Sequence, residues 1–100
     1  MARGAERRAI ARSIELLKQA QILGSQSRVS VEAIFFTNKL WAILIEDLAK
    51  PENALSAELK AKIISIGLWV LREAELISNH QSSNYRGLID VSLMIHEGLQ

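Results

Sequence analysis

The sequence contains no cysteine among its 100 residues, which excludes disulfide-bonded scaffolds and metal sites built on thiolates. It has one proline and five glycines, too few for the many turns of a β-sandwich. Its longest dense apolar run, residues 63–71, is far shorter than the roughly 20 residues that a membrane-spanning helix needs. Residues 1–8 hold no apolar signal-peptide core. We therefore expect a cytoplasmic protein with no membrane partner.

Neither sign of charge is in large excess, since 12 Lys and Arg residues stand against 11 Asp and Glu residues. The first 28 residues are nevertheless basic, and Arg7, Arg8 and Arg12 among them are candidate contacts for RNA or for an acidic protein surface. No aromatic residue that could stack on a base lies between these arginines. We favour the simpler interpretation of a solvated helix surface, so direct nucleic-acid contact is not expected.

Apolar residues recur at helical spacing along the chain and predict helices over about residues 3–23, 28–49, 57–78 and 85–97. Four helices joined by short connections predict an all-α fold, a small antiparallel bundle that forms a single domain over residues 1–100. The predicted core positions are Ile10, Ile14 and Leu17, then Val31, Ile34, Leu40, Trp41, Leu44, Ile45 and Leu48, then Leu59, Ile63, Ile66, Val70, Ala74 and Ile77, and finally Leu88, Val91 and Ile95, with Met94 beside them.

Local signals mark the predicted helix boundaries. Gly24 can end the first helix, and the stretch Ser25-Gln-Ser27 can supply an N-cap for the second. Pro51 disfavours helical backbone at the residue before it, so the second helix must end near residues 49–50. Ser56 can cap the third helix, and the second and third helices therefore form a hairpin.

The sequence offers no convincing catalytic chemistry. Its two histidines, His80 and His96, fall on a predicted loop and near the C-terminus, and no known metal-binding or nucleophile motif is present. The neighbouring carboxylates Glu46 and Asp47 diverge around a helix, as expected of a solvated face. We predict a protein that is not an enzyme and that has no metal site and no cofactor.

Two apolar pairs fall outside the predicted core faces and are candidates for partner binding. Phe36 and Ile43 lie seven residues apart on the second helix, and Trp69 and Leu76 do so on the third, with Arg72 beside them. Apolar pairs bordered by charged residues are typical of a groove for a partner helix. Alternatively, another helix of the chain or a homodimer interface covers them.

An ordered set of residues runs through the predicted hairpin and is followed by the apolar third helix: Leu40, Trp41, Asp47, Leu48, Pro51, Glu52, Asn53 and Leu55. With this set, residues 35–73 and 87–100 resemble the FlaF family, the flagellar biosynthesis regulators of alphaproteobacteria, and look most like its rhizobial branch. We interpret these motif residues as mostly structural. Ser56 stands where the family often has proline, and either residue can start a helix.

The resemblance implies a role in flagellum biogenesis, in the control of flagellin production or export. FlaF-type proteins work alongside or against FlbT, which acts on flagellin mRNA. We expect flagellin as the partner, bound by a chaperone-like adaptor that covers the amphipathic terminal helices of flagellin. The alternative is a post-transcriptional regulator of flagellin mRNA that acts through or against FlbT, with or without direct RNA contact.

Overall fold

The computed structural model describes residues 3–98, which fold into four helices. The helices are α1 (Arg3–Leu23), α2 (Arg28–Ala49), α3 (Ala57–Ser78) and α4 (Tyr85–Gly98). The predicted boundaries are confirmed, except that α4 extends to Gly98 instead of ending at residue 97. The prediction of an all-α antiparallel bundle is also confirmed.

The helix ends follow the sequence signals. The Ser27 side chain accepts a hydrogen bond from the Ser30 backbone N–H at 3.2 Å and caps α2. Ser56 caps α3 in the same way. Gly24 follows α1 with a φ of 91°, a backbone conformation that glycine adopts without steric cost. Lys50, before Pro51, has extended backbone and ends α2.

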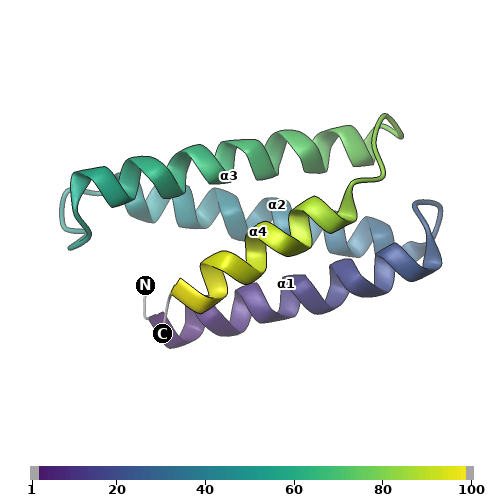
Figure 1. Cartoon of the computed structure of the whole chain (residues 1–100), viewed down its shortest axis with the longest axis horizontal. Helices are drawn as coiled ribbons and strands as arrows, with labels where there is room; N and C mark the ends of the chain where they lie inside the picture. Colours follow the sequence, from purple (N-terminus) through teal and green to yellow (C-terminus); the bar gives the residue numbers. More distant parts are fainter. Residues whose placement is uncertain (1–2, 99–100) are drawn as a thin grey trace.

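Successive helices run in opposite directions, and α4 returns obliquely over α1 (Figure 1). Helix α1 packs against both α2 and α4, whereas α3 packs against α2 and touches α4 only sparsely. The molecule measures 40 × 23 × 18 Å along its principal axes. Because α3 and α4 touch only sparsely, the two helices diverge towards the end of the molecule where α1 begins (Figure 1).

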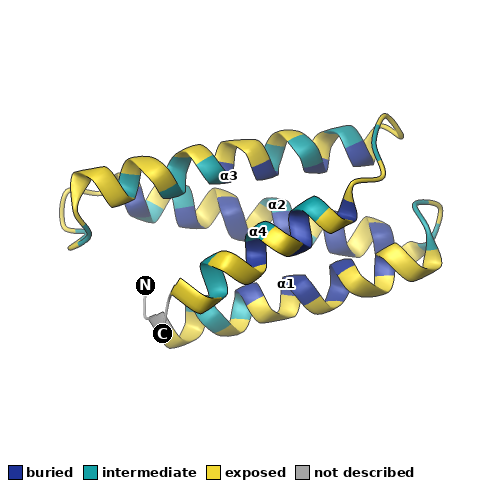
Figure 2. Cartoon of the chain, viewed as in Figure 1, coloured by how far each residue is buried: buried dark blue, intermediate teal, exposed yellow. Residues whose placement is uncertain are grey.

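The core lies where α1, α2 and α4 face one another, and Figure 2 shows the buried residues of these helices turned inward. Trp41 is the largest fully buried side chain. The buried hydroxyls of Ser30 and Tyr85 are hydrogen-bonded to each other and so connect α2 to α4. α3 contributes Val70, Ala74 and Ile77 to the same core.

Three predicted core positions were wrong. Val31 is 69% exposed because α3 ends beside it and leaves that side of α2 uncovered. Leu59, in the first turn of α3, is exposed because α4 has diverged from α3 at that end. Met94 is exposed because α4 packs mainly against α1, which leaves much of its surface without a neighbour.

Thr37 provides a stability prediction. Its side chain is fully buried, and its hydroxyl has no hydrogen-bond partner among the described residues. Replacing Thr37 by valine keeps the shape and removes the buried hydroxyl, so the free energy of unfolding should rise by about 1 kcal/mol in urea denaturation. Thr37→Ser, which keeps the hydroxyl and loses the methyl group, should lower it by a similar amount. A loss of stability in Thr37→Val would mean that a buried water satisfies the hydroxyl.

Candidate partner-binding surface

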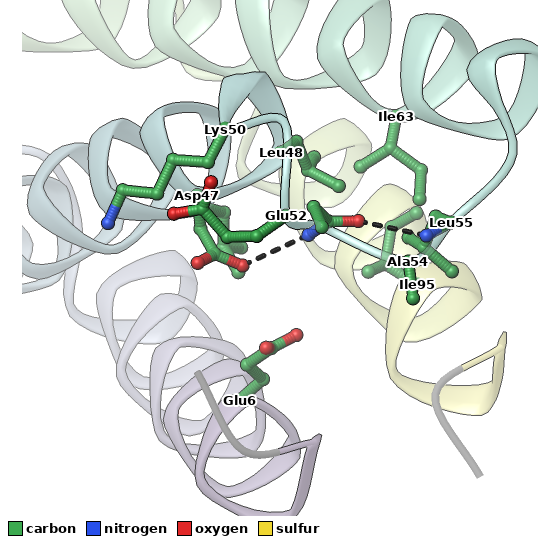
Figure 3. Close-up of a pocket in the computed structure, with 11 residues that line it drawn as sticks. Glu6, Asp47, Leu48, Lys50, Glu52, Ala54, Leu55, Ile63 and Ile95 are labelled. Atoms are coloured by element: carbon green, nitrogen blue, oxygen red, sulfur yellow. Dashed lines mark hydrogen bonds between the residues drawn. The ribbon is translucent and has the colours of Figure 1, made fainter.

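A cleft of about 320 Å³ lies at the end of the molecule where α3 and α4 diverge. Helices α2, α3 and α4 and the α2–α3 turn contribute its large apolar side chains: Leu44, Leu48, Leu55, Ile63 and Ile95. Figure 3 shows Leu55, Ile63 and Ile95 grouped on one side of it. The first two leucines are buried and the other three residues are half-buried, so the cleft exposes apolar surface to solvent. It exists because α3 and α4 fail to close over each other at this end.

The α2–α3 turn shapes the mouth of the cleft through Asn53. The Asn53 side-chain amide donates a hydrogen bond to the Asp47 carboxylate at 3.2 Å. Its carbonyl oxygen accepts one from the Leu55 backbone N–H at 3.1 Å (Figure 3). A side chain that bonds the backbone two residues on is typical of asparagine in turns. These two bonds fix Leu55 against the end of α2.

The rim of the cleft is more acidic than basic. Glu6 from α1, Asp47 from α2 and Glu52 from the turn line it, with Lys50 as the one basic residue among its lining. An apolar floor with an acidic rim suits an amphipathic segment that carries basic residues beside its apolar stripe.

The motif residues divide into two groups. Leu40 and Trp41 are buried in the core, as expected of structural residues. The other group, except for the exposed Pro51, lines the cleft: Asp47, Leu48, Glu52, Asn53 and Leu55. The interpretation of the motif residues as mostly structural did not include a place for this second group at a cleft. Their concentration around a single turn was the available signal.

The predicted partner-binding residues lie elsewhere, and none of them lines the cleft. On α3, Trp69 is 39% exposed, Arg72 is exposed and Leu76 is half-buried. On α2, Ile43 is 46% exposed, whereas Phe36 is half-buried and packs against the core. Only Ile43 of the α2 pair thus offers substantial apolar surface.

The three candidate RNA contacts on α1, Arg7, Arg8 and Arg12, are also absent from the lining of the cleft. Arg8 and Arg12 are exposed one turn from each other, and Arg12 pairs with Glu15 at 3.3 Å. Arg7 is half-buried, and its Nε atom is buried without a hydrogen-bond partner among the described residues. Of the three, Arg8 and Arg12 are therefore the more accessible to a partner.

Among residues 3–98, no group of three or more His, Cys, Asp or Glu side chains could hold a metal ion. None of the helices in this range combines the length and the apolar character needed to cross a membrane.

Comparison with models of protein families gives a match over nearly the whole chain. A family model described as "Flagellar protein FlaF" matches residues 1–99. No curated protein and no solved structure matches the chain.

Proposed function

Because the chain belongs to the FlaF family of flagellar proteins, we propose that it is a non-enzymatic, chaperone-like adaptor that binds flagellin and so controls flagellin production or export. The observation that carries this proposal is the cleft between α3 and α4, with its apolar floor and acidic rim. The family match covers the motif residues that line it.

Helix-in-groove binding is the mechanism that we propose. An amphipathic helix buries its apolar face in a groove and leaves its polar face in water. Leu55, Ile63 and Ile95 offer half-buried apolar surface to such a helix, and the rim carboxylates attract basic residues beside its stripe. Unassembled flagellin, with amphipathic terminal helices, would be protected from aggregation in this way.

The experiment is isothermal titration of monomeric flagellin into the protein. We expect micromolar or tighter binding by the wild type. The double variant Glu52→Lys, Leu55→Ala alters the rim and the floor together, and it should weaken binding at least about tenfold. Circular dichroism would check that its helix content is unchanged.

Two matched variants make the result specific to the cleft. Glu32→Lys changes the net charge as Glu52→Lys does, at an exposed residue of α2 outside the cleft, and should bind like the wild type. Trp69→Ala, Leu76→Ala removes the predicted outer pair on α3. Loss of binding in this variant alone would move the flagellin site from the cleft to the outer side of α3. Absence of heat with wild-type protein would contradict flagellin binding altogether.

The second candidate function is regulation of flagellin mRNA through or against FlbT, and the exposed Arg8 and Arg12 favour it. FlbT serves as a parallel titrant, and binding to FlbT without binding to flagellin would support this function. Direct RNA contact requires an affinity that falls steeply with salt and that weakens in Arg8→Ala, Arg12→Ala.

A further inference from the structure

Helix α2 carries a row of residues that nothing in the described part of the chain covers fully. Its members alternate at spacings of four and three residues, which places them along one side of the helix. We call this row the α2 seam, and it consists of Val31, Phe35, Asn38, Ala42, Ile45 and Ala49. Phe35 is 67% exposed, and the two alanines are exposed as well. None of the six residues carries a charge.

Helix α3 carries a second row with the same spacing. This α3 seam consists of Ala61, Ile64, Leu68, Leu71, Glu75 and Ser78. Leu68 is 57% exposed, and Ile64 and Leu71 are half-buried. Glu75 is the one charged residue in the two seams together.

The two seams adjoin and form one face. The Cβ of a residue at position 67 would lie 2.9 Å from the Ile45 Cδ1 atom, so the α2 seam borders α3 at mid-length. Near the end of α3, Val31 and Phe35 line a shallow cleft together with Ser78. Two neighbouring rows with coiled-coil spacing form an apolar face. Two helices of another molecule can pack against such a face, so that four helices come together.

The α2 seam is self-complementary in size when it meets its own copy in antiparallel orientation about Ala42. Phe35 and Ala49 are each seven residues from Ala42, on opposite sides, so the large ring of each copy meets the small side chain of the other. Ala42 meets Ala42 of the second copy, where a small residue lets two helices approach closely. Gly67 of α3 lies level with Trp41 and Ile45 of α2, close to Ala42 along the helix. The exposed Leu68, next to Gly67, therefore lies near the point where the two copies of Ala42 would meet.

The charges bordering the α2 seam are complementary in the same arrangement. Lys39 lies three residues before Ala42 and Glu46 four residues after it, and both are exposed. Antiparallel pairing brings Lys39 of each copy to Glu46 of the other, twice by symmetry. Within one chain the Lys39 ammonium lies 5.8 Å from the centre of the Phe35 ring, so it already covers part of the seam.

We propose that the face formed by the α2 and α3 seams binds a second copy of this chain, in a two-fold symmetric dimer whose α2 helices pair antiparallel about Ala42. This inference concerns a different face from the cleft and does not depend on the proposed function.

Sedimentation velocity over a range of concentrations tests the proposal. The wild type should be dimeric at about 100 μM and dissociate on dilution. Ala42→Glu places two carboxylates at the axis and should raise the dissociation constant at least about tenfold. The control is Ala11→Glu, at an exposed alanine of α1 outside both seams, which should dimerise like the wild type.

A charge exchange tests the pairing itself. Lys39→Glu and Glu46→Lys each place like charges opposite one another and should each weaken dimerisation. Mixing the two variants restores opposite charges at both junctions, so the mixture should form heterodimers. Monomeric wild type, or a dimer indifferent to Ala42→Glu, would overturn the proposal. Monomeric wild type whose flagellin binding is lost in Ala42→Glu would assign this face to flagellin instead.

Discussion

Replacing Trp41 by alanine should lower the free energy of unfolding by about 4 kcal/mol, because it empties the largest fully buried site of the core. Trp41 is 0% exposed and belongs to the cluster shared by all four helices. Its neighbours sit on rigid helices that can collapse only partly into the vacated volume. Urea denaturation followed by far-ultraviolet circular dichroism measures the change.

Trp41→Phe is the matched control, because it retains an aromatic ring and removes the indole N–H. That N–H is buried without a partner among the described residues, so its loss leaves no new group unsatisfied. We expect this variant to lose about 1.5 kcal/mol. A loss in Trp41→Phe as large as in Trp41→Ala would mean that the indole N–H makes an essential hydrogen bond, for example to a buried water.

Gly67→Leu should lower the free energy of unfolding by roughly 3 kcal/mol, because it forces a side chain into the contact between α2 and α3. An added Cβ alone would lie 2.9 Å from the Trp41 ring and 2.9 Å from the Ile45 Cδ1 atom. The end of the Ile45 side chain can move aside, but the buried indole ring cannot. Leucine would therefore push the two helices apart, and thermal unfolding would show the loss.

Two variants separate this effect from helix propensity. Gly67→Ala gains about 1 kcal/mol of propensity and meets a milder clash, so its stability should lie between those of the wild type and Gly67→Leu. Ser65→Leu places the same side chain on the exposed side of α3 and should change stability by less than about 0.5 kcal/mol. If Gly67→Leu were as stable as Ser65→Leu, the close approach at Gly67 would not exist.

The helix boundaries were predictable because each is determined locally. Ser27 and Ser56 cap the helix that follows them, and Pro51 excludes helical backbone at the residue before it, whatever the rest of the chain does. The buried stripes were predictable where a helix has neighbours along its length, as at Ile10, Ile14 and Leu17.

The exposed surfaces were less predictable, because they depend on how far each helix follows its neighbour. Periodicity placed Val31 and Leu59 in the core, but α3 ends beside the first and α4 diverges from the second. The cleft arises from the same divergence, and the local signal for it was the concentration of motif residues around the α2–α3 turn. The row through Phe35 and Ala42 could likewise have been found from its alternating spacing of four and three residues.

The sparse contact between α3 and α4 has a consequence for the dynamics of the fold. Among the described helices, α3 is held mainly by α2, whereas α1 is held by both α2 and α4. Partial opening favours segments with few buried contacts, and the buried residues of α3 all lie from its midpoint onward, at Gly67, Val70, Ala74 and Ile77. We therefore expect amide protons in the first half of α3 to exchange through partial openings that leave α1, α2 and α4 packed, so a partner can enter beside this half without global unfolding.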